Sequence, residues 1–175
     1  MAPISLPDQG VEIHPIAQGD LFAVLDVYRQ CEDFLALGPV PVASMEMVLK
    51  DIEISKEEGG LFCGIYSTDG KMIGIIAFVA NNYRGEPATS YLELLMIAAP
   101  YRNQGLGRAI VEAVELEIRK ESTVSTILAG VQVNNPRAIR FWQRNGYHIF
   151  SGPELMPDRT TTFGLRKDLE SRSST

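Results

Sequence analysis

The turn around Gly105 and Gly107 carries the clearest chemical signal in this chain. An apolar, strand-like run over residues 91–97 leads into it, and a strong helical pattern over 109–120 follows. Glycine has no side chain, so main-chain N–H groups can converge there on a ligand. The first N–H groups of the following helix have no partner inside the helix and point the same way. The sequence therefore predicts a cradle for a phosphate or pyrophosphate group.

Two other phosphate-binding motifs fit this turn poorly. A nucleotide-hydrolase loop needs Lys and then Ser or Thr after its last glycine, whereas Arg108 and Ala109 stand there. A dinucleotide-binding fold needs three glycines after the first strand of the chain. This turn has two glycines, and it lies past the midpoint. For the glycines alone, an ordinary strand-to-helix connection remains the alternative interpretation.

The elements that position this turn are predicted in the order strand, two helices, three strands, helix, strand, helix, two strands. Asp20 and Ser44 are placed to cap the first two helices, and Asp69-Gly70 is typical of a hairpin. This order predicts an α+β fold, a mixed sheet covered by helices in a three-layer arrangement. The expected strands cover residues 11–16, 61–67, 72–79, 91–97, 126–133, 147–150 and 160–166, with a loop over 152–158.

Composition limits the class of protein. The 175 residues, 45% hydrophobic and 22% charged, indicate one domain over residues 1–170 and a disordered tail at 171–175. The net charge of −6 argues against a nucleic-acid partner and suits a cationic substrate. Cys31 and Cys63 are too few for a disulfide framework or a zinc site, so we expect buried thiols and no metal. Without a signal peptide or a membrane-spanning run, a cytoplasmic protein with no membrane partner is expected.

Two blocks of the sequence resemble those of the GNAT superfamily of N-acetyltransferases. The first is the apolar strand followed by the spacing Arg-x-x-Gly-x-Gly at residues 102–107. The second, over residues 135–147, reads Asn-Pro-Arg-Ala-Ile-Arg-Phe-Trp-Gln-Arg-Asn-Gly-Tyr. It is similar to the family's block N-x-x-A-x-x-(apolar)-(aromatic)-x-x-x-G-(aromatic). Both blocks fall on the predicted strand–helix units in the family's order.

The resemblance covers almost the whole chain and implies a GNAT-like fold with acetyl-coenzyme A (acetyl-CoA) as cosubstrate. The sheet would be mostly antiparallel and flanked by about four helices, and its central parallel strands would splay apart around the pantetheine arm. The main chain of Met96 and Ile97 would pair with the pantetheine. Asn135 would contact it from the other side, or cap its own helix, and these roles can coexist. The pyrophosphate would be held by the turn that Arg102 shapes, at Asn103, Gln104, Gly105, Leu106, Gly107 and Arg108.

Acetylation of an amine needs a base, because most amines are protonated at neutral pH, and a donor for the developing oxyanion. Glu93 is the candidate base, since it is the lone carboxylate of an apolar strand and should share a face with Leu95 and Ile97. Apolar surroundings raise the pKa of a carboxyl group. The alternative is that Glu93 faces water or pairs with an arginine. The family-like oxyanion donor is the backbone N–H of Ile97.

The leaving thiolate marks a departure from the family pattern. Trp142 stands where many members carry a tyrosine that protonates the sulfur, and an indole N–H is too weak an acid for this. Either the thiolate leaves with the assistance of water or a hydrogen bond, or Tyr147 or Tyr101 takes this role. Trp142 is then expected to pack against the pantetheine.

The predicted activity is direct transfer of an acetyl group from acetyl-CoA to a primary amine of a small molecule or peptide. Direct transfer is expected because neither cysteine falls in the two blocks. Glu32 and Asp33, or Glu154 and Asp158, could neutralise a cationic acceptor, although solvated helix and loop charges explain each of them better when it is taken singly. Family precedent also allows a homodimer. The competing hypothesis is a non-catalytic module of the same fold that senses acyl-CoA, which Trp142 would suit.

Overall fold

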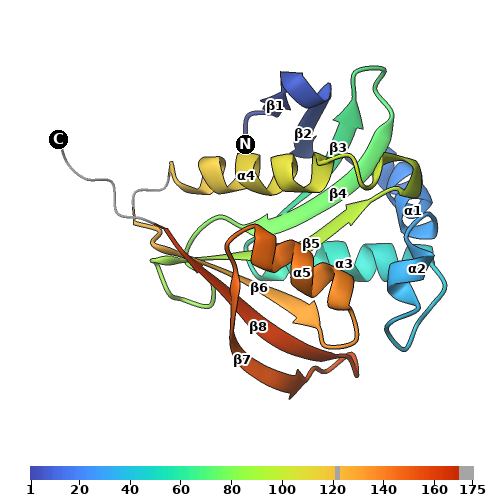
Figure 1. The fold of residues 1–175 in the computed structure, drawn as a ribbon. Coiled ribbons are helices and arrows are strands. Elements are labelled where there is room, and N and C mark those ends of the chain that lie inside the picture. Colours follow the sequence, from blue (N-terminus) through green and yellow to red (C-terminus); the bar gives the residue numbers. More distant parts are fainter. Residues whose placement is uncertain (121–122, 170–175) are drawn as a thin grey trace.

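A mixed sheet with helices on both faces forms the described part of the chain, residues 1–120 and 123–169 of the computed structural model (Figure 1). The tail predicted at 171–175 lies outside these residues. The strand order is β1-β2-β3-β4-β5-β6-β8-β7, and only the β5–β6 pair is parallel. This confirms the predicted α+β fold. The eight strands are β1 (Ile4–Leu6), β2 (Val11–Pro15), β3 (Leu61–Ser67), β4 (Met72–Val79), β5 (Thr89–Ile97), β6 (Thr126–Gln132), β7 (His148–Leu155) and β8 (Thr161–Asp168).

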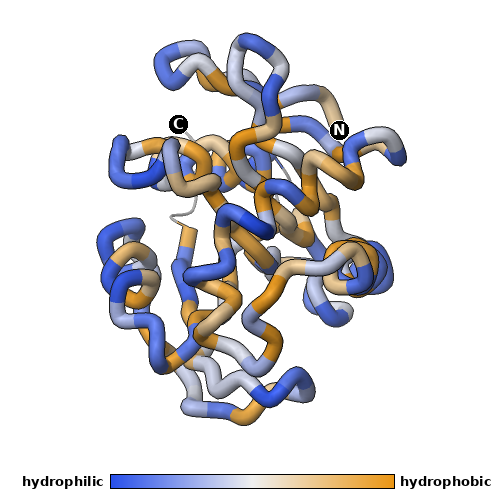
Figure 2. Tube along the Cα trace, turned by 90° about the vertical axis from the view of Figure 1, so that its right-hand side faces the viewer, coloured by the Kyte–Doolittle hydropathy of each residue, from blue (hydrophilic) through white to orange (hydrophobic). Residues whose placement is uncertain are grey.

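Two helical layers cover the sheet. On one face α4 and α5 pack over a core that includes Ile110, Val114 and Trp142. On the other face α1 and α3 enclose a second core around Val24 and Tyr28. Apolar segments follow the strands between the layers, and hydrophilic segments gather at the outer turns (Figure 2). No described helix is long and apolar enough to cross a membrane. The described helices are α1 (Leu21–Arg29), the single turn α2 (Glu32–Leu35), α3 (Met45–Glu57), α4 (Leu106–Ile118) and α5 (Pro136–Arg144).

The parallel strands β5 and β6 separate part of the way along their length. Their pairing runs from Thr89 opposite Thr126 to Leu92 opposite Ala129. Beyond that point both strands continue, but within the described residues they no longer pair with each other. The predicted splay of the central strands is confirmed, and it opens a gap that is bordered by backbone groups of β5.

A bulge interrupts β5 where the gap begins. On the neighbouring strand β4, Ala77 lies opposite Leu94 and Phe78 opposite Leu92, which leaves Glu93 as an extra residue on β5. A bulge shifts the side chains that follow it to the opposite face of the sheet. Leu92 accordingly packs in the core on the α4 side, and Leu94 in the core on the α3 side.

The bulge overturns one prediction for Glu93. Strict alternation placed its side chain on the face of Leu95 and Ile97, which pack on the α4 side. Instead the carboxylate reaches the other face and accepts a hydrogen bond from Ser55 of α3. The sequence pattern carried no sign of the inserted residue, because every neighbour of Glu93 in this strand is apolar and fits either face.

Two helix caps were predicted, and one of them is correct. The Ser44 hydroxyl accepts a hydrogen bond from the N–H of Met47 (3.1 Å) and caps α3 as expected. Asp20 does not cap α1, because its carboxylate accepts from the N–H of Ala17 (2.7 Å) and closes the turn before the helix. The spacing that suits an N-cap also suits this upstream turn.

The outer strands differ most from the prediction. β1 went undetected because three residues are too few to show a periodic pattern. β7 continues to Leu155, through the start of the predicted loop, although Gly152 and Pro153 are turn-forming residues. Proline is tolerated in an edge strand, and the register shifts of the β7–β8 pair absorb the irregularity.

Candidate active site

The turn before α4 has the geometry of an anion cradle. Gly105 is the residue that precedes the helix, with φ +81°, and no side chain caps the helix there. The N–H of Ala109 is bonded to the Gly105 carbonyl (3.2 Å), so the N–H groups of Leu106, Gly107 and Arg108 belong to the first turn and have no intrahelical partner. A Cβ at Gly105 would meet no atom within 4 Å, so the cradle is open. These residues fit a diphosphate.

The side chains of the turn hold it in place. Asn103 has φ +62° and accepts a hydrogen bond from Arg137 of α5 (2.6 Å). Gln104 donates to the Pro100 carbonyl (3.1 Å). A Cβ at Gly107 would lie 3.2 Å from the Phe141 ring, so this glycine permits close packing of α4 against α5. The side chains of Asn103 and Gln104 therefore bond to the protein, which leaves the backbone as the ligand-binding part of the turn.

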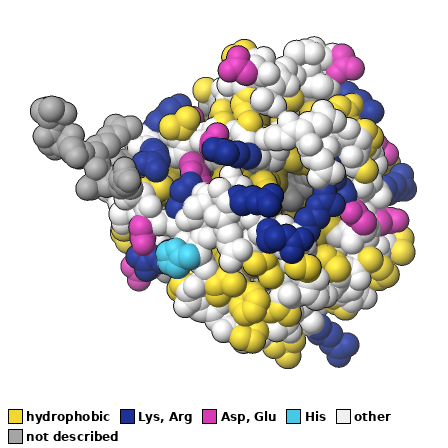
Figure 3. Space-filling view, viewed as in Figure 1, with side chains coloured by type: hydrophobic (Ala, Val, Ile, Leu, Met, Phe, Trp, Pro, Cys, Tyr) yellow, Lys and Arg dark blue, Asp and Glu magenta, His cyan; other side chains and the backbone are white. Residues whose placement is uncertain are grey.

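A basic surface flanks the cradle, which the sequence reasoning missed. Arg137, Arg140 and Arg144 are exposed and lie on one side of α5, at the helical spacing i, i+3, i+7. Arg108 is exposed at the start of α4 and pairs with Glu112 (2.7 Å). In Figure 3, Lys and Arg side chains surround a hollow over α4 and α5. The spacing of the three arginines was a signal available from the sequence, and it gives this acidic protein a local site for anions.

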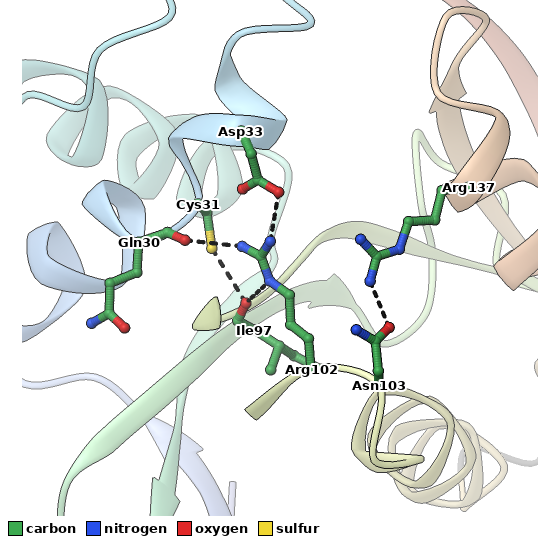
Figure 4. A network of polar contacts seen from close by, with 7 residues as sticks. All are labelled: Gln30, Cys31, Asp33, Ile97, Arg102, Asn103 and Arg137. Carbon is green, nitrogen blue, oxygen red and sulfur yellow. Dashed lines mark hydrogen bonds and ion pairs between the residues drawn. The ribbon is translucent and has the colours of Figure 1, made fainter. Parts of the chain in front are cut away.

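Arg102 points into the protein and joins three elements (Figure 4). Its Nε donates to the Ile97 carbonyl (2.6 Å) at the end of β5. Its guanidinium also pairs with Asp33 of α2 (2.6 Å) and donates to the Gln30 carbonyl (3.0 Å) after α1. Arg102 therefore shapes the entrance of the turn through these contacts.

The thiol of Cys31 lies in the same network, a position that the sequence did not reveal. Cys31 is buried, and its thiol donates to the Ile97 carbonyl (3.5 Å). Burial raises the pKa of this thiol, which therefore stays protonated and can act as a donor. Burial also raises the pKa of Cys63 to about 12. The prediction of two buried thiols is confirmed.

The backbone along the gap differs by one residue from the prediction. The N–H of Ala98 bonds to the Ile73 carbonyl of β4 (2.9 Å), so the alternate residue Met96 also directs its backbone toward β4. Ile97 and Leu95 direct theirs to the opposite side, toward the gap. The Met96 backbone therefore faces β4 and not the gap, whereas Ile97 has a gap-facing N–H beside a carbonyl that accepts hydrogen bonds from Arg102 and Cys31.

A cavity of about 670 Å³ lies on the α3 side of the sheet, on the opposite face from α4. Its walls are largely apolar side chains from α2, α3, β4 and β5, and the turn between β7 and β8 closes it. Four carboxylates line it: Glu46 and Asp51 of α3, Glu93 of β5, and Asp158 of the β7–β8 turn. Such a cavity suits a cationic molecule with an apolar body.

Glu93 is the carboxylate nearest the start of the gap. Its Oε2 accepts a hydrogen bond from Ser55 (2.5 Å), and the side chain is half-buried. Burial raises its pKa, Glu58 adds to this effect, and the bond from Ser55 opposes it. Among the described residues no lysine or arginine forms an ion pair with Glu93, so the alternative of a charge neutralised by arginine has no support.

The acids predicted for the acceptor, Glu32 and Asp33, have other partners. Glu32 accepts a hydrogen bond from the N–H of Ala43 (3.0 Å), and Asp33 pairs with Arg102, which lowers the pKa of Asp33. Neither lines the large cavity, whereas Asp158 does. Both residues hold the segment around α2, and sequence reasoning missed Asp51 and Ser55 in their place.

Trp142 lies in the core on the α4 side. It is 8% exposed, with its ring edge-to-face against Phe141 (5.2 Å) and Tyr147 (5.0 Å). Tyr147 donates to the buried carboxylate of Glu115 (2.9 Å), and burial raises its pKa above the ordinary range, so Tyr147 is not the missing acid. Tyr101 has its ring 5.9 Å from Lys71 at the β3–β4 hairpin. The role of Tyr101 as the acid stays a prediction.

Asn135 caps its own helix. Its side-chain oxygen accepts a hydrogen bond from the N–H of Ala138 (2.9 Å) at the start of α5. Capping uses the oxygen and leaves the amide nitrogen free to donate to another group. The two roles considered for Asn135 are therefore compatible.

The fold and this site define a class of protein. The turn before α4 and the acidic cavity lie on opposite faces of the sheet, and residues of β5 and β6 that border the gap also line the cavity, an arrangement that suits a coenzyme A-dependent acyltransferase. Residues 23–147 match the family model described as "Acetyltransferase (GNAT) family". The chain belongs to this family of acyltransferases, whose usual cosubstrate is acetyl-CoA.

Several relatives share parts of the sequence or the fold. N-alpha-acetyltransferase 30 of Schizosaccharomyces pombe is 27% identical over 77 residues, which are 44% of this chain and 51% of that protein. The chain thus spans about half the length of this curated relative. An acetyltransferase from Thermus thermophilus has a TM-score of 0.76 and 19% identity, with 91% of this chain and 97% of that chain covered. Spermidine N-acetyltransferase from Vibrio cholerae, solved with CoA and spermine, has a TM-score of 0.69 and 11% identity, covering 91% and 95%.

Proposed function

We propose that this protein is an N-acetyltransferase that moves an acetyl group from acetyl-CoA directly to a primary amine of a small molecule or peptide. One observation carries the proposal. Glu93 is a half-buried carboxylate that receives one hydrogen bond and no cation among the described residues, and it stands where the gap meets the acidic cavity. The N-alpha-acetyltransferase and the spermidine N-acetyltransferase named above are both enzymes for amines, which supports this acceptor class.

The residues around the gap fit acetyl-CoA. The first-turn N–H groups of α4 would hold the diphosphate, and the gap-facing backbone of Leu95 and Ile97 would pair with the pantetheine amides. The exposed arginines of α5 would stabilise the phosphate charges. When bound, acetyl-CoA supplies an acetyl group activated as a thioester.

Glu93 and Ile97 divide the chemistry between them. Glu93 takes a proton from the ammonium group of the acceptor, directly or through water, and its raised pKa makes it a stronger base than an ordinary glutamate. The N–H of Ile97 donates to the carbonyl oxygen as negative charge develops there. The amine nitrogen would form a bond to the acyl carbon as the carbon–sulfur bond breaks, and the second proton that the nitrogen then loses would pass, directly or through water, to the leaving thiolate, so that no tyrosine is required as the acid.

A non-catalytic acyl-CoA sensor is the second candidate, and its one support is Trp142 in place of tyrosine. The arrangement of Glu93 weighs against it. Holding an unneutralised carboxylate in a partly buried site costs free energy, and a binding module would gain nothing from it. The expectations of a cytoplasmic location and of a homodimer stay predictions from the sequence.

A thiol-release assay tests the proposal. Wild-type protein is mixed with acetyl-CoA and a panel of primary amines, and free thiol is followed over time. Glu93→Gln should lower kcat by about 10²–10⁴-fold, the usual contribution of a general base. CoA affinity, measured by calorimetry, should stay unchanged in this variant. Glu53→Gln, at an exposed position of the same helix as Ser55, is the matched control and should behave as wild type.

Two outcomes would contradict the proposal. One is CoA binding without thiol release on any amine, which would favour the sensor. The other is full turnover by Glu93→Gln, which would assign the base to another group.

A further inference from the structure

The end of the cavity away from Glu93 holds two more carboxylates that come from different elements. Asp51 of α3 accepts a hydrogen bond from the hydroxyl of Tyr28 (2.7 Å). Asp158 approaches from the β7–β8 turn, and both line the cavity. Burial raises the pKa of Asp51 most and the charge of Asp158 adds the smallest part, whereas the hydrogen bond from Tyr28 and the charge of Lys50 lower it. The like charges of Asp51 and Asp158 act on each other, and a cation placed between them would be stabilised by both.

The distance between the two acidic ends follows from the helix. Asp51 and Ser55 are four residues apart on α3, so they lie on the same side of the helix, about 6 Å apart along its axis. Ser55 holds Glu93, so the Glu93 carboxylate is bonded to the residue one helical turn from Asp51. Apolar side chains, among them Ile54 and Leu94, form much of the cavity wall.

An independent observation concerns Gln132 at the end of β6. Its side-chain oxygen is buried and has no hydrogen-bond partner among the described residues, and the residue lines the same cavity. A buried acceptor without a donor is costly, and a ligand N–H group in the cavity would reach this oxygen once the glutamine side chain turns toward it. Among the described residues none of the four carboxylates that line the cavity forms an ion pair, and Lys50 is the only basic residue in its lining.

We propose that the acceptor is a dication, a primary amine whose second cationic group lies about one helical turn away across an apolar spacer. This inference rests on the proposed function. The amine to be acetylated faces Glu93, and the second cation lies between Asp51 and Asp158. Asp51 and Asp158 are then residues that determine specificity, because they bind the acceptor without contacting the reacting atoms.

The test compares two amines with one skeleton. In p-xylylenediamine a benzene ring separates two aminomethyl groups, and in 4-methylbenzylamine a methyl group replaces one of them. With wild-type protein, kcat/KM for the diamine should be at least about tenfold higher than kcat/KM for the monoamine. A tenfold effect is at the lower end of what one charge–charge interaction in a partly buried site contributes to affinity. Two amino groups alone would explain only a factor of two.

Variants then locate the preference. Asp51→Asn keeps an acceptor for Tyr28 and should reduce the preference to about twofold by raising KM for the diamine. Asp158→Asn should have the same effect. Because Asp158 lies in an exposed turn, this variant can replace Asp51→Asn in the test if Asp51→Asn folds poorly. Glu53→Gln should retain the full preference.

Each outcome decides one question. Equal kcat/KM for the two amines, or a preference unchanged in both Asp51→Asn and Asp158→Asn, overturns the dication while acetylation of monoamines keeps the proposed function. Absence of thiol release with every amine, despite CoA binding, overturns the proposed function and this inference together.

Discussion

Glu93 and Glu115 are two buried or half-buried carboxylates with opposite surroundings. Glu115 of α4 is 5% exposed, and it accepts hydrogen bonds from the Tyr147 hydroxyl (2.9 Å) and the Lys167 ammonium (2.6 Å). Glu93 of β5 receives one hydrogen bond, from Ser55. Both side chains lie among apolar neighbours in the fold, yet Glu115 has a cation within ion-pair distance and Glu93 has none among the described residues.

The difference shows that burial by itself does not mark a reactive carboxylate. A buried charge is stable when its partners neutralise it, as Lys167 and Tyr147 do for Glu115. An acid that lacks a cation and opens on a cavity is stabilised by whatever cation enters the cavity. We therefore assign Glu115 to stability and Glu93 to function.

The largest contrast is expected from Glu93→Gln. Activity should fall by about 10²–10⁴-fold, while the free energy of unfolding should stay equal or rise. The pKa of Glu93 is higher in the folded protein than in the unfolded chain, so stability falls as pH rises through the interval between these two values. Glutamine, which is always neutral, removes this cost at neutral pH. Denaturant unfolding beside the thiol assay measures both effects, and a clear loss of stability would contradict the assignment.

The converse is expected from Glu115→Gln. Lys167 would lose its ion pair while its side chain is only 21% exposed, so the free energy of unfolding should fall by about 2 kcal/mol. The value of kcat should change less than twofold, because α4 keeps its first turn. Urea unfolding midpoints give the stability, and Glu112→Gln, on the exposed side of the same helix, should lower it by less than about 1 kcal/mol, because its ion pair with Arg108 is exposed. A large fall in kcat at wild-type stability would break the comparison.

The two glycines of the turn show the same contrast, since one is expected to affect ligand binding and the other stability. In Gly105→Ala the alanine would have to adopt φ near +81°, which costs about 1 kcal/mol for a residue with a Cβ and disturbs the start of α4. CoA affinity should therefore fall several-fold. Gly107→Ala would push a methyl group to 3.2 Å from Phe141, so about 1 kcal/mol of stability should be lost through overpacking. Calorimetry with CoA distinguishes the two variants, because only Gly105→Ala should weaken CoA binding. An unchanged affinity in Gly105→Ala would show that this turn does not bind the diphosphate.

Ion pairs provide a smaller contrast. Arg102→Gln removes the contacts that join β5, α1 and α2, and α2 supplies part of the cavity wall. We expect the KM of the acceptor to rise about three- to tenfold, with kcat less affected. The pair of Arg166 and Asp168 is exposed on both sides, so Arg166→Gln should change KM less than twofold. Equal KM values in the two variants would show that Arg102 does not position the cavity.

The smallest effect concerns pH. Glu93 must be ionised to act as a base, so kcat/KM should fall as the pH drops through its raised pKa, at a higher pH than for an ordinary glutamate. The hydrogen bond from Ser55 lowers this pKa, whereas burial and Glu58 raise it. Ser55→Ala should therefore move the acid limb of the profile upward by about 0.5–1 unit, since one hydrogen bond contributes about 1 kcal/mol. A downward shift would show that another group controls the limb.

Much of the fold was predictable because its signals are local. The hairpin at Asp69-Gly70, the cap at Ser44 and the helix start at Pro136 each depend on a few adjacent residues, and each was predicted correctly. β1 and the far part of β7 escaped because edge strands are specified by their neighbours in the sheet and not by their own pattern.

The cofactor side of the site was predictable for the same reason, since the turn at Gly105 and the helix behind it are contiguous in the chain. The acceptor side was not, because Asp51, Glu93 and Asp158 meet only after α3, β5 and the β7–β8 turn have packed together. One bulge decided which face Glu93 reaches. The sequence by itself thus determined the short-range backbone geometry, namely the turns that need glycine and the helix starts that need a capping residue. Tertiary packing decided which carboxylates share a cavity and which of them have a cationic partner. The reason is that both depend on contacts between residues far apart in the chain and on how deeply those residues are buried.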